Sequence, residues 1–164
     1  MVYMQHNRAV KATKASSYEN VIGEISRTCL LMRTRLISRV LTAMYDEGLR
    51  PFGIGSAQFA LLVIISRMEP ATRAEIGRYL HQDRSTLTRT LKLILTEDWA
   101  EEIEDEAGGR RRPIVLTTAG RELLRDAAPA WRAAQSQAKS LLGKDGVFAV
   151  TDIANRLTKR QPKA

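Results

Sequence analysis

The chain has 164 residues, 44% of them hydrophobic, which is enough for one compact domain with a substantial core. Lys and Arg outnumber Asp and Glu by 26 to 18, so the formal net charge is +8. The sequence has no run of eighteen apolar residues and no apolar stretch near its start, which argues against a membrane helix and a secretory signal. A single cysteine excludes an intrachain disulfide and fits a reducing compartment. We therefore expect a cytoplasmic protein that does not associate with membranes.

Most of the excess positive charge lies at the two ends of the chain. Three cations in the first 17 residues and four in the last nine have no acidic neighbour there. We interpret residues 1–18 as a basic, mobile tail. Such tails either keep a protein soluble or touch nucleic-acid phosphates weakly, and both interpretations stay open.

The predicted elements begin with a long helix over residues 19–47, in which apolar side chains recur at steps of three and four. Gly48 and Pro51 are predicted to end it. Ser56 is then expected to cap a second helix, AQFALLVIISRM, which is apolar nearly all round. This second helix should therefore lie in the middle of the core, and the Glu-Pro pair that follows should end it.

Two short helices joined by a tight turn are predicted next, within TRAEIGRYLHQDRSTLTRTLKL at residues 72–93. Thr72 and Glu75 have the spacing of a capping box at the start of the first helix. Asp83 is a favourable cap for the second helix, which should end near Asp98. Apolar residues of the second helix form one stripe at helical spacing: Leu87, Leu91, Ile94 and Leu95.

The opposite face of this second helix carries short hydroxyls and long cations but no carboxylate. Its residues are Ser85, Thr86, Arg89, Lys92 and Thr96. A helix packed only for stability does not need such a surface, whereas a helix in the major groove of DNA does. This face is the candidate DNA-reading surface.

A short hairpin is predicted after these helices, with strands at residues 99–104 and 113–116. The connecting sequence DEAGGRRR has a Gly-Gly tip followed by Arg110, Arg111 and Arg112. Three arginines alone are more often a solvated loop. After a helix-turn-helix at this spacing, however, they favour a tip that enters the minor groove or follows the phosphates beside it.

A long helix over residues 119–142 should follow the hairpin, with Thr118 as its cap and a kink at Pro129. Gly143 and Gly146 are predicted to separate it from a last helix at 147–159. The fold class is therefore mainly α, with the element order of a winged helix-turn-helix.

From about Cys29 to Lys159 the chain resembles the multiple-antibiotic-resistance regulator (MarR) family of bacterial transcription factors. The segments that carry the resemblance are SAQFALL at 56–62, DRSTLTRTL at 83–91 and RRRPIVLTTAG at 110–120. The family usually has an aspartate two residues before the wing arginine, where this chain has Gly108. This departure suggests a more flexible wing, although Arg110 itself is retained.

The resemblance implies one domain over 19–160, with the winged helix-turn-helix at about 54–117. Long dimerisation helices at 19–48 and 118–160 would flank it and interlock with those of a second subunit. The implied function is a ligand-responsive regulator, commonly a repressor, that binds a pseudo-palindromic operator in double-stranded DNA as a homodimer. The implied effectors are aromatic or phenolic acids or their thioesters.

The expected DNA-contacting residues combine the helix face with the wing. They are Ser85, Thr86, Thr88, Arg89, Lys92, Arg110, Arg111 and Arg112. Arg89 is the best candidate for a bidentate guanine contact or a phosphate clamp, and the sequence does not choose between them.

Cys29 and Trp131 are candidate ligand-binding residues, each with a plainer alternative. One branch of the family senses hydroperoxides through a cysteine flanked by two tyrosines. Tyr45 matches one of these tyrosines, but Cys29 is about two residues too early and Ser56 occupies the position of the other. A cysteine on an apolar face is more often a small buried hydrophobe. Trp131 would suit the wall of an effector pocket, or it packs at a subunit interface.

Other classes of function fit less well. The sequence has no Gly-rich phosphate loop, no nucleophile elbow and no paired nucleophile and histidine, so we expect no enzyme activity. With two histidines and one cysteine, neither a metal site nor a cofactor is expected. A winged-helix module that binds protein partners is the remaining rival, and the carboxylate-free helix face argues against it.

Overall fold

The computed structural model describes residues 17–104 and 111–159, and these are mainly helical with one small sheet. The basic tail, except for residues 17 and 18, lies outside the described residues, as do the hairpin tip and Arg110. The chain divides into two compact units, Met1–Val40 and Leu41–Ala164.

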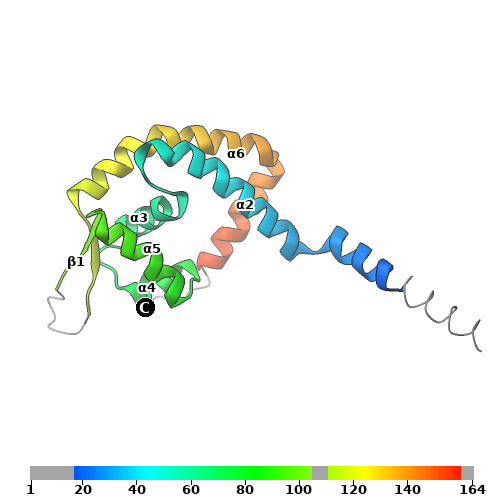
Figure 1. The fold of residues 1–164 in the computed structure, drawn as a ribbon, viewed down its shortest axis with the longest axis horizontal. Helices are drawn as coiled ribbons and strands as arrows, with labels where there is room; N and C mark the ends of the chain where they lie inside the picture. Colours follow the sequence, from blue (N-terminus) through cyan, green and yellow to red (C-terminus); the bar gives the residue numbers. More distant parts are fainter. Residues whose placement is uncertain (1–16, 105–110, 160–164) are drawn as a thin grey trace, which may run out of the picture. The chain divides into compact units, whose positions relative to one another are not determined.

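The first unit differs from the single helix predicted over 19–47. Residues 17–28 are helical, Cys29 interrupts the helix, and α2 then covers Leu30–Leu49 and continues into the second unit (Figure 1). Two side chains donate to backbone carbonyl oxygens beside the interruption. The Thr28 hydroxyl donates to the Glu24 carbonyl oxygen at 2.8 Å, and the Arg33 guanidinium donates to the carbonyl oxygen of Arg27. Apolar periodicity continues through this point, which is why it gave no signal of the break.

The second unit begins its core with α3, Ser56–Met68, after a short 3-10 helix η1 at Arg50–Phe52. The prediction that Ser56 caps α3 was wrong, because Gly55 is the cap residue. Two other side chains satisfy the first amides of this helix. The amide of Gly55 donates to Gln58 Oε1 at 2.6 Å, and that of Ser56 donates to Asp46 Oδ1 at 2.6 Å.

The two helices of the predicted helix-turn-helix are α4, Arg73–Leu80, and α5, Arg84–Thr96. Both predicted caps are confirmed. Thr72 Oγ1 accepts from the amide of Glu75 at 3.3 Å, while Glu75 Oε2 accepts from the amide of Thr72 at 2.7 Å. Asp83 Oδ1 accepts from the amide of Thr86 at 2.9 Å. Each helix therefore starts where its own sequence supplies an acceptor for otherwise unsatisfied amides.

The predicted hairpin is confirmed in a shorter form. Strands β1, Ala100–Glu102, and β2, Ile114–Leu116, pair antiparallel with Ala100 opposite Leu116. Ala71 adds an isolated antiparallel bridge to Ile114 on the other edge of β2. This bridge was not predicted, because one residue between a proline and a helix cap carries no strand pattern. It joins the loop before α4 to the wing.

The last helical segment is α6, Thr118–Lys159, and its start differs from the prediction by one residue. Thr117, not Thr118, supplies the capping oxygen, which accepts from the amide of Gly120 at 3.1 Å. The predicted separation at Gly143 is confirmed by its left-handed backbone, with φ 66° and ψ 173°. Pro129 lies inside the helix, which continues through it.

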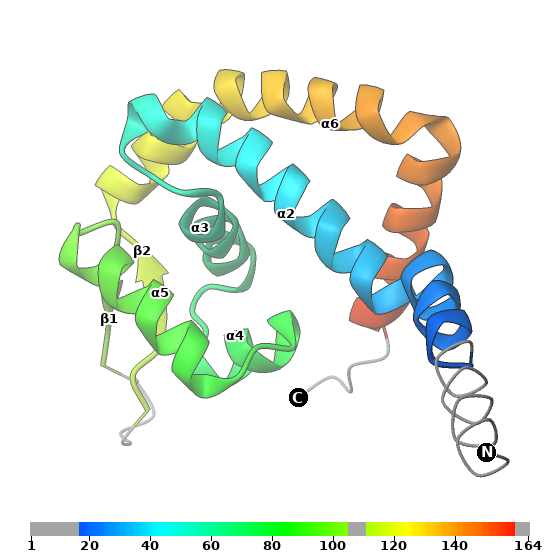
Figure 2. The same cartoon turned by 45° about the vertical axis from the view of Figure 1, so that its right-hand side comes forward.

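In the second unit, α3 occupies the centre, as its all-round apolar sequence predicted. It contacts α4, α5, β2 and α6, and these elements surround it in Figure 2. Its buried residues are Phe59, Leu61, Leu62 and Ile65. Among the described helices none is by itself long and apolar enough to cross a membrane, and the bent pair Leu30–Phe52 with Ser56–Met68 meets that test by length and composition only.

Gly120 marks a close approach between α6 and the residue before β1. A Cβ atom at this position would lie 1.9 Å from the carbonyl oxygen of Trp99, and the same oxygen accepts from the amide of Thr117 at 3.2 Å. Two backbone segments therefore touch here, and neither can withdraw without breaking the hydrogen bond. Close packing against the Trp99 carbonyl therefore explains why the LTTAG segment ends in glycine.

We predict that Gly120→Ala lowers the free energy of unfolding by about 1–3 kcal/mol or more, because overpacking usually costs this much. Gly48→Ala is the matched control, because its Cβ would meet its nearest neighbours at 3.5 Å, an ordinary contact distance. The control should be neutral or stabilising by up to about 1 kcal/mol, since alanine favours a helix. Urea unfolding of both variants measures the difference, and equal stabilities would contradict the packing assignment.

Candidate nucleic-acid interface

The orientation of α5 is fixed by its apolar stripe. Leu87, Leu91 and Ile94 are at most 3% exposed and belong to the core around α3. On the opposite side the structure places exposed Ser85, Thr88, Arg89 and Lys92, with Thr86 half-buried beside them. The helix thus presents three cations, Arg84, Arg89 and Lys92, and several hydroxyls to solvent, and no residue from Arg84 to Thr96 carries a carboxylate.

Asp83 organises the start of this face. Its Oδ1 atom accepts from Ser85 Oγ at 2.6 Å and from the amide of Thr86, while Oδ2 accepts from Thr86 Oγ1 at 2.7 Å. These hydrogen bonds, that of the Ser85 hydroxyl first, hold the pKa of the Asp83 carboxyl well below its usual range. The carboxylate is therefore ionised throughout the physiological pH range, and it ties the first turn of α5 together.

The turn between α4 and α5 is closed by backbone hydrogen bonds. His81 adopts a left-handed conformation, with φ 51° and ψ 32°, and its amide donates to the Arg78 carbonyl oxygen at 3.1 Å. The amide of Gln82 donates to the Gly77 carbonyl oxygen at 3.0 Å. This ending of α4 is a left-handed cap of the kind usually made by glycine. It sets the angle at which α5 leaves the turn.

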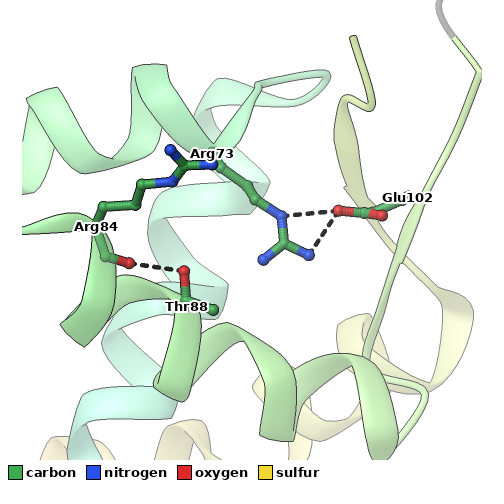
Figure 3. Close-up of polar contacts among 4 residues, drawn as sticks. All are labelled: Arg73, Arg84, Thr88 and Glu102. Carbon is green, nitrogen blue, oxygen red and sulfur yellow. Dashed lines mark hydrogen bonds and ion pairs between the residues drawn. The ribbon is translucent and has the colours of Figure 1, made fainter. Parts of the chain in front are cut away.

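An ion pair attaches the wing to α4. Arg73 Nε and Nη2 lie 2.8 Å and 2.7 Å from Glu102 Oε1 on β1, and Figure 3 shows the guanidinium reaching across to this strand. Both side chains are partly buried, which makes this pair stronger than a fully solvated one. Sequence analysis missed it, because the two residues are 29 positions apart and have no shared pattern.

Glu69 makes a second attachment on the other edge of the wing. Its Oε2 atom accepts from the amide of Leu116 at 2.9 Å, and Oε1 lies 2.7 Å from Arg121 Nη2 on α6. Only 18% of the Glu69 side chain is exposed, so this carboxylate works in a largely dry environment. It joins the end of α3, strand β2 and the first turn of α6, and it was also missed.

Two of the three predicted wing arginines, Arg111 and Arg112, are described, and both are exposed. The pKa of Glu75 is lowered, first by the hydrogen bonds from Thr72 and to a smaller extent by the positive charges of Arg78 and Arg111. Arg111 therefore lies close enough to the start of α4 to affect a carboxylate there.

A pocket of about 390 Å³ opens beside α5, between that helix, the end of α2 and the start of α3. Its walls combine apolar surface with hydroxyls, an amide, a carboxylate and one guanidinium. The lining residues are Thr42, Asp46, Gly55, Ser56, Ala57, Gln58, Arg89, Thr90 and Leu93. Arg89 is thus both an exposed residue of α5 and part of the pocket wall. Leu93, 43% exposed, has a place in the same wall.

The two predicted ligand-binding residues lie elsewhere. Trp131, 37% exposed on α6, is not among the residues that line this pocket. Cys29 is half-buried at the interruption before α2. The hydroxyl of Tyr45 donates to Gln135 Oε1, which joins α2 to α6, and burial raises the pKa of this phenol. Sequence analysis missed the pocket, because its walls come from three separated segments.

Comparisons with known proteins agree on one class. A model of the MarR family matches residues 52–111. The "Uncharacterized HTH-type transcriptional regulator YwoH" of Bacillus subtilis is 32% identical over 80 residues, which cover 49% of this chain and 58% of that protein. The match therefore spans less than two thirds of this relative.

Solved structures match over more of the chain. The M. tuberculosis transcriptional regulator MosR in complex with DNA is 32% identical, with a TM-score of 0.69 over 80% of this chain and 96% of MosR. A mutant of E. coli MarR, solved with operator DNA, shares the fold at 21% identity, with a TM-score of 0.70 over 82% of this chain and 96% of that one.

The helix-turn-helix followed by a two-stranded wing defines a winged helix-turn-helix protein. The chain belongs to the MarR family of transcriptional regulators.

Proposed function

We propose that this chain is a ligand-responsive regulator, most simply a repressor, that inserts α5 into the major groove of double-stranded DNA as a homodimer. The observation that carries the proposal is the outward face of α5, with Ser85, Thr88, Arg89 and Lys92 exposed and no carboxylate on the helix. The crystal structure of MosR, a 32% identical relative, holds that regulator in complex with DNA, which supports the same role here.

The charges on this surface have separable tasks. Guanidinium groups can pair with guanine O6 and N7 in the major groove, whereas a lysine ammonium suits a phosphate. Arg89, in the middle of the exposed face, is the proposed base or phosphate contact, and Lys92 lies one turn further along the helix. Arg111 and Arg112, together with Arg110 outside the described residues, would follow the minor groove or its phosphates.

A homodimer is proposed because both ends of the described chain expose large apolar side chains. In the first unit they include Val21, Ile22, Ile25, Leu30, Leu31, Met32, Leu36, Ile37 and Val40, and on α6 they include Leu141, Phe148, Val150, Ile153 and Leu157. A stable monomer rarely leaves this much apolar surface in water. Burial of these helices against a second copy would remove it and would present two α5 helices to one pseudo-palindromic site.

The pocket beside α5 supports the proposed response to a small molecule. An aromatic or phenolic acid, or a thioester of one, would place its ring against Leu93 and Ala57 and its anionic group near Arg89. Since Arg89 is also the proposed DNA contact, an occupant that engages the guanidinium would compete with DNA for it. Binding of the ligand would therefore release the operator.

We predict that Arg89→Ala weakens binding to the DNA upstream of the protein's own gene by about 1–3 kcal/mol, if the contact is to a base edge. Arg125→Ala, which removes the same charge from an exposed position on α6, is the control. Fluorescence anisotropy at several salt concentrations measures both affinities.

If Arg89 contacts a phosphate instead of a base, the substitution would lower the slope of log affinity against log salt concentration by about 1. Affinities equal to the wild type at every salt concentration would remove Arg89 from the interface, and complete absence of specific binding would favour the protein-interaction module.

The dimer is tested with Phe148→Asp, because this side chain is 73% exposed in the single chain. A charge in a dry interface leaves an uncompensated ion, so the variant should dissociate to monomers and lose operator affinity. Asn155→Asp adds the same charge at an exposed polar position of α6 and should remain dimeric. Sedimentation equilibrium distinguishes the two, and a wild-type protein that is monomeric at micromolar concentration would refute the proposal.

Ligand response is tested by thermal shift with aromatic acids and their coenzyme A esters. A compound that binds only the native state must raise the melting temperature, by an amount that grows with its concentration. Ala57→Met should narrow the pocket, abolish the shift and leave DNA affinity intact, because Ala57 lies on α3 rather than α5. A shift that persists unchanged in this variant would place the effector elsewhere.

A further inference from the structure

The hydroxyl groups on the proposed DNA-reading face already use their protons within the protein. Ser85 Oγ donates to Asp83 Oδ1 at 2.6 Å and Thr86 Oγ1 donates to Asp83 Oδ2 at 2.7 Å. Thr88 Oγ1 donates to the carbonyl oxygen of Arg84 at 2.7 Å, and Figure 3 shows this hydroxyl turned back toward that carbonyl. None of the three protons points to the solvent side where DNA would lie.

A hydroxyl has one proton to donate and two lone pairs that accept. When the proton is committed, the outward side of the oxygen offers lone pairs only. The two hydrogen bonds to Asp83 are stronger than ordinary ones, because their acceptor is ionised. The lowered pKa of Asp83 keeps that acceptor charged at neutral pH. Ser85 is exposed while Thr86 is half-buried, so the Ser85 oxygen is the more accessible of the two.

We propose that Asp83 makes Ser85 a hydrogen-bond acceptor toward DNA, so that Ser85 selects the amino group of adenine or cytosine in the major groove. This inference rests on the proposed function, because it needs α5 in that groove. Adenine N6 and cytosine N4 are the major-groove donors, whereas guanine O6, guanine N7 and thymine O4 are acceptors. Arg89 and Lys92 can only donate, so they pair with those acceptors. On this face, Ser85 would therefore recognise hydrogen-bond donors of the bases, while Arg89 and Lys92 would recognise acceptors.

A phosphate contact from Ser85 is disfavoured by the same geometry. Phosphate oxygens only accept, so Ser85 would have to withdraw its proton from Asp83 and lose a charge-assisted hydrogen bond. The Asp83 carboxylate, one hydrogen bond away, would also repel the phosphate. An amino group meets neither obstacle, because it donates to a lone pair of Ser85 Oγ. The negative charge of Asp83 makes this lone pair more basic. Asp83 is thus a positioning residue that acts through Ser85.

Selection from a random-sequence duplex library identifies the base pair that Ser85 contacts. The wild type and Ser85→Ala are selected in parallel, and the position whose preference disappears in the variant is assigned to Ser85. Ser66→Ala makes the same substitution at an exposed position of α3 and is the matched control. Every base pair contains one adenine or cytosine, so the selection locates the contacted pair, and removal of the amino group then decides which group Ser85 recognises. If Ser85→Ala loses no preference at any position, the inference is overturned.

The selected duplex is then made without the amino group, by replacing the adenine with purine or the cytosine with 2-pyrimidinone. Loss of one hydrogen bond should weaken wild-type binding about 2- to 10-fold. Ser85→Ala should bind the two duplexes equally. Asp83→Asn retains a helix cap but has only one acceptor oxygen, so it releases at least one hydroxyl proton. Its discrimination between the duplexes with and without the amino group should weaken.

Failure of this inference is distinguishable from failure of the proposed function. If the wild type selects a motif but tolerates removal of the amino group, or if Ser85→Ala only lowers the salt slope, DNA binding stands and the acceptor role of Ser85 is wrong. If the wild type selects no motif and Arg89→Ala changes nothing, the proposed function fails and this inference fails with it.

Discussion

Burial of three residues on α5 decides which chemistry this protein offers to its surroundings. Leu87, Leu91 and Ile94 are held against the central helix α3, and a helix with one face fixed has the other face fixed as well. Rotation of α5 by one residue, about 100°, would bring hydroxyls into the core and cost the burial of the leucines. The exposed position of Arg89 is therefore a consequence of apolar packing on the far side of the helix.

Polar contacts hold the remaining parts of the winged unit against that core. Glu69 connects strand β2 with α6, and Arg73 connects β1 with α4, so both strands of the wing have an attachment near the helix-turn-helix. Their partial burial matters, because solvated ion pairs contribute little. The close approach at Gly120 adds a steric attachment between Trp99 and α6. Together these contacts give the hairpin a defined direction relative to α5, which a short two-stranded sheet would lack by itself.

Sequence reasoning succeeded where the signal is local and failed where it is not. The caps at Thr72 and Asp83, the apolar stripe of α5 and the central position of α3 follow from residues within a few turns of one another, and all were predicted. The cap of α3 was wrongly assigned to Ser56. The Asp46 carboxylate, which accepts from the Ser56 amide, lies ten residues earlier on another helix, and the local sequence gives no sign of this contact. The Ala71 bridge, the two ion pairs of the wing and the pocket beside α5 join segments that are distant in sequence. The periodicity of the sequence does not reveal such contacts, because they depend on how whole helices and strands pack against one another.

The double placement of Arg89, on the outer face of α5 and in the wall of the pocket, has a consequence for anyone who would re-engineer this regulator as a biosensor. Under the proposed function, sensitivity to inducer and affinity for the promoter would depend on this one side chain, so a library that randomises it would change both properties at once. Thr42 and Ala57 line the same pocket from α2 and α3. Diversity introduced at those two positions would retune inducer choice while the promoter-facing helix keeps its native sequence.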